Sequence, residues 1–140
     1  MSSNIFRVVY CSHSVTANPA GGMAALLDQI LSVARENNAR SGITGALLCN
    51  DGLFAQVLEG DLMAVQDIFE RIQRDARHND VLVLEAGMAA ERLFDRWDMA
   101  LAEAADPARA AATLTRALAH PDATGGTEVV ALLDGLVHPD

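Results

Sequence analysis

The sequence predicts an α+β fold built around one β-sheet. Compact β-rich runs alternate with helical patterns in the order β-α-β-β-α-β, and a turn typical of β-hairpins, Asn50-Asp51-Gly52, separates the two central runs. A chain of 140 residues, 51% of them hydrophobic, has room for a single core. This order of elements is the ferredoxin-like arrangement, in which an antiparallel-containing sheet carries two helices on one face.

Local patterns predict the first half of the sheet. Residues 5–12 are a compact β-rich run, and breakers up to Gly22 mark the loop that follows it. Apolar residues at positions 23, 26, 27, 30, 31 and 34 recur at the spacing of one helix face, so a helix should end near Asn37 and Asn38. The predicted hairpin, residues 43–59, comes next.

A second helix and two more strands complete the predicted sheet domain, residues 1–101. Asp61 is placed to cap the helix, which should end near residues 77–80. Residues 81–85 predict a fourth strand, and residues 97–101 predict a fifth. The apolar face of the helix comprises Leu62, Val65, Ile68, Phe69 and Ile72.

The C-terminal extension, residues 102–140, is predicted to be helical. Asp106 can cap a helix over residues 106–119, with Pro107 at the first helical position. A second short helical pattern covers residues 127–137. Both helices have apolar faces that need cover, so we expect them to pack on the sheet face that the first two helices leave bare.

The composition excludes several classes of function. A formal net charge of −9 argues against nucleic acid or an anionic membrane surface as the main partner. No segment approaches ~20 consecutive apolar residues, and the N-terminus lacks a basic region followed by an apolar stretch. The two cysteines, Cys11 and Cys49, indicate free thiols in a reducing compartment rather than a zinc site. We therefore expect a cytoplasmic protein without a metal.

One polar residue, Gln56, interrupts an apolar strand. Strand side chains alternate between the two faces, so Phe54, Gln56 and Leu58 share one face of the sheet. A primary amide buried without a hydrogen-bond partner costs roughly 1–3 kcal/mol. We therefore expect a polar partner for Gln56, either within the protein or on a ligand.

Alternation places other polar or polarisable side chains on shared sheet faces. Tyr10 lies on one face with Phe6 and Val8, and Trp97 shares a face with Met99. Adjacent strands lie ~4.8 Å apart, so the Tyr10 hydroxyl could bond the Gln56 amide. Each of these residues, taken alone, is more often a packing residue than part of a site.

Polar residues also gather where the two predicted helices end. The asparagine pair at the first helix end is typical of C-terminal capping. Basic residues at the end of the second helix complement its dipole, or else form a polar rim around a groove that holds a ligand ring. The residues at that second end include Arg71, Asp75, Arg77 and His78.

Taken together, these segments resemble the BLUF family, the blue-light sensors that use FAD. The resemblance covers about residues 5–101 through the stretches RVVYCS, NNARSGITGALL, FAQVLEG, QRDARHNDVLVLE and RLFDRWDM. Their combination, in this order and at this spacing, is highly specific. Ala55 replaces a larger apolar residue of the family, and Cys11 stands where serine is common. Both lie on the opposite sheet face by alternation, so neither should remove the chemistry.

The resemblance implies a role for each matching position. Tyr10 corresponds to the photoactive tyrosine, Gln56 to the switching glutamine, and Asn38 to the asparagine that holds the carbonyl edge of the flavin ring. Trp97 and Met99 match the fifth-strand pair that reports the switch. The region that contacts the flavin and its ribityl side corresponds to Arg71, Asp75, Arg77 and His78.

The implied mechanism has FAD between the first two helices and no enzymatic activity. After blue-light excitation Tyr10 donates an electron and then a proton, and Gln56 changes its orientation or tautomer. An amide carries donors at one end and an acceptor at the other, so reorientation exchanges them. The signal would pass through the fifth strand and the C-terminal helices to an unidentified downstream protein. Analogy with short members of the family favours a homo-oligomer.

Two other functions compete with this interpretation. A ferredoxin-like hydrolase of the acylphosphatase kind needs a cationic cradle for phosphate, but the loop of residues 12–22 contains no lysine or arginine. A flavin-free interaction or small-molecule-sensing module would explain the acidic surface and the C-terminal helices. It would not explain why Tyr10, Asn38, Gln56 and Met99 occur together.

Overall fold

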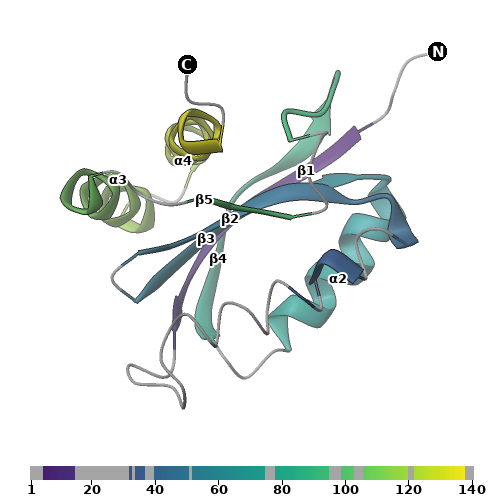
Figure 1. Ribbon diagram of the computed structural model, residues 1–140, viewed down its shortest axis with the longest axis horizontal. Helices are drawn as coiled ribbons and strands as arrows, with labels where there is room; N and C mark the ends of the chain where they lie inside the picture. Colours follow the sequence, from purple (N-terminus) through teal and green to yellow (C-terminus); the bar gives the residue numbers. More distant parts are fainter. Residues whose placement is uncertain are drawn as a thin grey trace.

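The computed structural model describes residues 5–14, 32, 34–36, 40–50, 52–74, 78–94, 99–102, 106–119 and 122–137. Within them the chain forms one sheet with helices on both faces (Figure 1). The strands and helices are β1 (Ile5–Ser14), β2 (Thr44–Asn50), β3 (Leu53–Gly60), α2 (Leu62–Gln73), β4 (His78–Ala89), β5 (Ala100–Ala102), α3 (Pro107–Ala119) and α4 (Ala123–Val137).

The strand order in the sheet is β4-β1-β3-β2-β5. β1 pairs antiparallel with β3 and β4, β2 pairs antiparallel with β3, and β5 pairs parallel with β2. The predicted α+β order is confirmed for the elements that the structure describes. The predicted first helix, residues 23–38, lies outside the described residues except for residues 32 and 34–36.

The hairpin between β2 and β3 closes as the sequence predicts. Asn50 pairs with Leu53, so two residues, Asp51 and Gly52, connect the strands. Gly52 has a φ of 80°, a backbone conformation that a residue with a Cβ rarely adopts. The turn therefore sets the register that brings Leu47 opposite Gln56.

Several predicted boundaries are wrong. α2 ends at Gln73 rather than near residues 77–80, and His78 is the first residue of β4, where it pairs with Ser14. β4 is also longer than the predicted residues 81–85, because β1 offers pairing partners along its whole length. The described part of the last strand is Ala100–Ala102, whereas residues 97–101 were expected.

Helix capping follows the sequence prediction at α3 but not at α2. The Asp106 side chain accepts a hydrogen bond from the Arg109 amide at 3.2 Å, as predicted. The Asp61 side chain makes no capping hydrogen bond, although its carbonyl accepts one from Val65 at 2.9 Å. α4 begins at Ala123 rather than at residue 127, and Asp122 caps it through the Thr124 and Gly125 amides at 3.0 and 3.1 Å.

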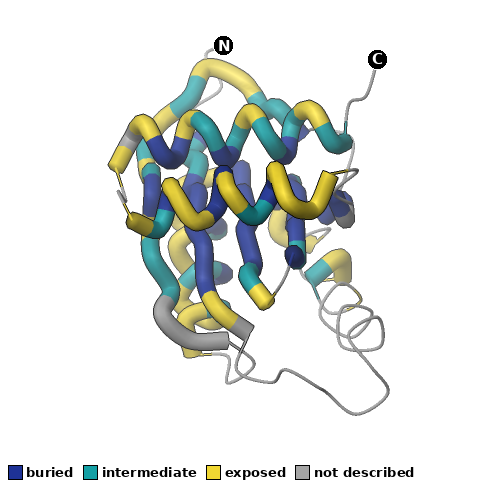
Figure 2. The backbone as a smooth tube through the Cα atoms, turned by 90° about the vertical axis from the view of Figure 1, so that its left-hand side faces the viewer, coloured by how far each residue is buried: buried dark blue, intermediate teal, exposed yellow. Residues whose placement is uncertain are grey.

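The sheet separates two hydrophobic clusters. α3 and α4 cover one face, and α2 lies against the other, as Figure 1 shows. On the α3/α4 side the inner helix positions are buried and the outer positions are exposed (Figure 2). Cys11 and Ala55 belong to this cluster, as alternation predicted, whereas Tyr10 and Phe54 lie on the α2 side.

No helix in the described part of the chain is long and apolar enough to cross a membrane.

Candidate functional site

Gln56 is buried on the α2 face of the sheet, with only 4% of its surface exposed. It lies in β3 between β1 and β2, and its Cα partners are Tyr10 on one side and Leu47 on the other. Val8, Phe54 and Leu58 share its face. The apolar surroundings leave Gln56 few places to find hydrogen-bond partners, so the partners that it does find are informative.

Tyr10 and Met99 supply those partners. The Tyr10 hydroxyl donates a hydrogen bond to Gln56 Oε1, and Gln56 Nε2 donates one to Met99 Sδ at 3.3 Å. Tyr10 is 3% exposed and Met99 1% exposed, so the three side chains form a chain of contacts shielded from water. The predicted pairing of Tyr10 with Gln56 is therefore present in the structure.

Packing from both sides holds Tyr10 and Met99 in place. The Tyr10 ring meets the Phe69 ring of α2 at a tilted 52°, with 5.3 Å between the ring centroids. Arg35 Nε donates to the Met99 carbonyl at 3.0 Å. A Cβ on Gly45 would lie 3.4 Å from Met99 Cε and 2.0 Å from the Val57 carbonyl oxygen. The absence of a side chain at residue 45 therefore lets the backbone of β2 lie close to the Val57 carbonyl of β3, beside the Met99 methyl group.

The two ends of the Gln56 amide are held unequally. The oxygen accepts from a phenol, a good donor, whereas the nitrogen faces a thioether, which is a weak acceptor. Among the described residues, Met99 Sδ is the only hydrogen-bond acceptor for Gln56 Nε2. An oxygen or ring nitrogen from a ligand would satisfy those N–H groups better than sulfur does. The donor set therefore fits a ligand ring whose edge carries hydrogen-bond acceptors.

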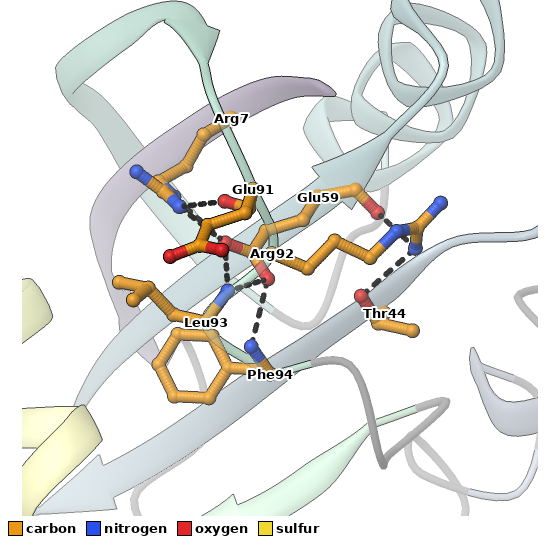
Figure 3. Close-up of polar contacts among 7 residues, drawn as sticks. All are labelled: Arg7, Thr44, Glu59, Glu91, Arg92, Leu93 and Phe94. Atoms are coloured by element: carbon orange, nitrogen blue, oxygen red, sulfur yellow. Dashed lines mark hydrogen bonds and ion pairs between the residues drawn. The ribbon is translucent and has the colours of Figure 1, made fainter. Parts of the chain in front are cut away.

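A second buried polar residue on β3, Glu59, was missed by sequence reasoning. Its carboxylate is fully buried, and it accepts hydrogen bonds from the backbone amides of Leu93 at 3.0 Å and Phe94 at 2.9 Å. Arg7 of β1 pairs with the same carboxylate, with Nη2 2.7 Å and Nε 2.8 Å from Oε2 (Figure 3). A charge placed in an apolar strand was the available signal, the same kind of signal that drew attention to Gln56.

Of the remaining predicted site residues, the structure describes only Arg71 and His78. Asn38, Asp75, Arg77 and Trp97 lie outside the described residues. Arg71 is exposed on α2 and pairs with Asp67 at 3.5 Å, the surface ion pair expected between neighbouring turns of a helix. His78 begins β4 and so stands on the sheet rather than on the helix end.

The two cysteines are free thiols, as predicted. Burial raises the pKa of Cys11 from 9.0 to about 12, and burial also raises the pKa of Cys49. Neither thiol is therefore activated as a nucleophile. No group of three or more His, Cys, Asp or Glu side chains suited to a metal occurs in the described part of the chain.

Comparison with known proteins finds a matching family and several relatives of this chain. The family model described as "BLUF: Sensors of blue-light using FAD" matches residues 5–100. The chain is 41% identical over 68 residues to photoactivated adenylate cyclase subunit beta of Euglena gracilis, and the match covers 49% of this chain and 8% of that protein. It is 32% identical over 94 residues to the blue light- and temperature-regulated antirepressor BluF of Escherichia coli, covering 67% of this chain and 22% of the relative.

Solved structures agree with the family match over more of the chain. The dark-state structure of BlrB, a BLUF protein, is 30% identical, covers 98% of this chain and 97% of its own, and superposes with a TM-score of 0.74. The photo-activated state of BlsA is 27% identical, with coverage of 97% and 96% and a TM-score of 0.72. A bacterial light-regulated adenylyl cyclase is 29% identical over 81% of this chain and 33% of its own, with a TM-score of 0.66. The first two matches include the region of α3 and α4.

Proposed function

This chain belongs to the BLUF family of flavin-based blue-light sensors, and we propose that its light response begins at the contacts between Tyr10, Gln56 and Met99. The single observation that carries the proposal is the unequal bonding of the buried Gln56 amide. Its oxygen accepts from Tyr10, and its nitrogen donates only to a thioether among the described residues. An amide held in this way has a second arrangement within reach, because its two ends exchange roles when it turns.

We propose FAD as the ligand. The N–H groups of Gln56 fit the acceptor-bearing edge of a flavin ring, and the apolar side chains around it suit the ring itself. Asn38, by its position in the family's pattern, would hold the ring's carbonyl edge. The ribityl side is assigned to the residues at the junction of α2 and β4, namely Arg71, Asp75, Arg77 and His78. One solved relative, BlrP1 of Klebsiella pneumoniae, is a complex with FMN and cyclic diGMP.

When bound, a flavin absorbs blue light and, once excited, becomes an acceptor for an electron and a proton. Tyr10 is the proposed donor, because its phenol is buried at the site and donates a hydrogen bond to Gln56 Oε1. Transfer of the electron and the proton from Tyr10 to a bound flavin would remove the hydrogen bond that holds the amide oxygen, and their return to Tyr10 would restore both partners. Between these two steps Gln56 is free to turn or to change tautomer, which presents a different end to Tyr10 and to Met99.

The proposed output runs from Met99 into the C-terminal helices. Met99 directly precedes β5, whose Ala100 and Ala102 pack in the cluster that contains Leu114 of α3 and Leu133 of α4. Asn50 Nδ2 also donates to the carbonyl of Pro107 at 3.1 Å, which ties the end of β2 to the start of α3. A change in Met99 can therefore reach α3 through direct packing.

The proposed receiver of the signal is a separate signalling protein, and self-association into a homo-oligomer is a further proposal. Relatives named as adenylate cyclases and as an antirepressor carry the matching segment within longer chains. We propose α3 and α4 as the surface that contacts the partner. Their inner sides pack on the cluster that contains Ala100 and Ala102 of β5, and their outer sides are exposed to solvent (Figure 2). This sensing role requires no catalytic residue in the chain.

The absorption spectrum before and after blue light tests the proposal. The purified protein should be yellow, should release FAD on denaturation, and should show a red shift that reverses in the dark. Tyr10→Phe and Gln56→Leu should each bind flavin and lose the shift, whereas Gln66→Leu, on the exposed surface of α2, should keep it. A Gln56→Leu protein with a normal photocycle would remove the proposed switch. A preparation that stays colourless after FAD addition would favour a flavin-free sensing module.

A further inference from the structure

The connection from β4 to β5 is fastened to the sheet by several polar contacts. Its residues Glu91–Phe94, which we call the β4–β5 connection, lie across one end of the sheet (Figure 3). The Glu59 carboxylate accepts from the Leu93 and Phe94 amides, and the Glu91 carbonyl accepts from Arg7 Nη2 at 3.0 Å. Three of its four residues are thus bound through their backbone.

The side chain of Arg92 adds a further attachment. Arg92 Nη1 donates to Thr44 Oγ1 at 2.9 Å and to the Glu59 carbonyl at 3.3 Å. Thr44 is the first residue of β2 and pairs with Glu59 near the end of β3. Arg92 therefore bonds to both strands of the hairpin at the end away from its turn. Together with Arg7 of β1, these contacts connect the β4–β5 connection to three neighbouring strands.

Glu59 is the centre of this arrangement. Its carboxylate is completely buried, and both of its oxygens accept hydrogen bonds from the connection, while Arg7 balances its charge. Charge-assisted hydrogen bonds of this kind are shorter and stronger than neutral ones. Glu59 therefore determines where Phe94 lies relative to β3.

The position of Phe94 matters because β5 is a short strand with few ladder hydrogen bonds of its own. β5 has three residues, and among the strands that the structure describes it pairs only with β2, through Ala46, Leu47 and Leu48. A strand this short contributes few ladder hydrogen bonds, and parallel pairing is slightly less stable per residue than antiparallel pairing. Only four residues, 95–98, lie between Phe94 and Met99 in the sequence, so the anchored connection limits how far Met99 can lie from Phe94.

We propose that Glu59 is a positioning residue for the light switch, which holds Met99 against Gln56 through the β4–β5 connection. Glu59 projects from the face of β3 opposite to Gln56, among the groups that hold Leu93 and Phe94, and so it acts without touching the flavin site. This inference rests on the proposed function in so far as Met99 and Gln56 form the switch. The placement of Met99 by Glu59 can, however, be measured in the dark without any light response.

The experiment compares Glu59→Gln with the wild-type protein after labelling methionine ε-methyl groups with ¹³C. Met99 is assigned by its loss in Met99→Leu, and the exposed Met63 and Met88 serve as internal references. Glu70→Gln is the matched control, because Glu70 pairs with Arg74 at 3.2 Å on the exposed surface of α2. Leu84→Ala controls for general destabilisation, because it opens a cavity on β4, the strand farthest from β5 in the sheet order.

In Glu59→Gln the Met99 methyl signal should move and broaden in the dark, while the signals of Met63 and Met88 stay in place. Neither control should move the Met99 signal. The dark recovery of the light-induced red shift should also change in Glu59→Gln and not in Glu70→Gln. If Glu59→Gln does not fold, Thr44→Val removes one attachment of Arg92 and should move the Met99 signal in the same way by a smaller amount.

An unmoved Met99 signal in folded Glu59→Gln, or in Thr44→Val where the first variant is unfolded, would overturn the inference. A Met99 signal that moves equally in Leu84→Ala would also overturn it, because positioning would then be no more than general stability. If Met99 moves as expected while the wild-type protein shows no light response, the proposed function fails and the placement of Met99 by Glu59 stands.

Discussion

β3 carries two buried polar side chains, Gln56 and Glu59, which lie three residues apart on opposite faces of the sheet. Glu59 accepts hydrogen bonds from two backbone amides and from a paired guanidinium, so both of its oxygens are satisfied. Gln56 has one good partner in Tyr10 and one weak partner in Met99. The two residues come from one strand and are both buried, yet they are bound very differently.

The difference in hydrogen bonding agrees with the proposal that β3 combines a fixed residue, Glu59, with a movable one, Gln56. A buried carboxylate with every lone pair occupied has no alternative arrangement of comparable free energy, so its surroundings are rigid. A buried amide with a weakly bonded end loses little when it turns. In the proposed mechanism, motion at Gln56 passes through Met99 while the nearby end of the sheet, around Glu59, stays in place.

The largest expected loss of stability comes from removing the buried Glu59 carboxylate. Glu59→Ala should lower the free energy of unfolding by about 3–5 kcal/mol, because it leaves buried backbone amides and Arg7 without their partner. Urea unfolding followed by circular dichroism measures the change. Glu70→Ala, which removes a surface ion pair, should cost less than about 1 kcal/mol. Equal losses in the two variants would mean that the Glu59 contacts carry no special stability.

A loss of stability of intermediate size is expected at alkaline pH. Cys11 is buried on the α3/α4 side of the sheet, where burial favours the neutral thiol over the charged thiolate. Burial raises the pKa of this thiol from 9.0 to about 12. Between these values the unfolded chain releases the proton while the folded chain retains it. The free energy of unfolding should therefore fall by about 1.4 kcal/mol per pH unit from this thiol as the pH rises above 9.

Urea titrations at pH 8 and at pH 10 measure that slope. Cys11→Ala should be less stable than the wild-type protein at pH 8 but should lose less on going to pH 10, since it lacks the titrating group. Parallel pH dependence in the two proteins would show that Cys11 does not titrate between those values.

The smallest expected effect on stability comes from replacing the hydrogen-bonded pair of Tyr10 and Gln56. The double variant Tyr10→Phe/Gln56→Leu should change the free energy of unfolding in the dark by less than about 1 kcal/mol, because the hydrogen bond and both of its polar groups leave the apolar site together. The same urea experiment measures it. A loss as large as that of Glu59→Ala would show that Gln56 is a structural group like Glu59, and the contrast between the two would disappear.

Sequence reasoning reached much of this site because its main signals are local. Alternation along β1 and β3 placed Tyr10 and Gln56 on one face, and the turn at Gly52 set the register between β2 and β3. The Tyr10–Gln56 contact then followed from the spacing of neighbouring strands. Met99 could be assigned through the resemblance, although its contact with Gln56 depends on a three-residue strand that no local pattern defines.

The contacts of Glu59 could not be predicted in the same way. Its backbone partners lie 34 and 35 residues further along the chain, in a segment without regular secondary structure. Arg7 lies 52 residues before it. Local patterns also failed at Asp61, whose carbonyl rather than its side chain serves α2, and at His78, which pairing with β1 draws into β4. In each case a long-range contact or a backbone group replaced the expected local one.

The most direct measurement is the light-minus-dark infrared difference spectrum of protein labelled with ¹³C at glutamine side-chain carbonyls. A movable Gln56 beside a fixed Glu59 predicts a label-sensitive amide band that disappears in Gln56→Leu, together with no carboxylate band that depends on Glu59. A spectrum without any glutamine band, or with a carboxylate band that Glu59→Gln removes, would contradict the assignment of the two roles on β3.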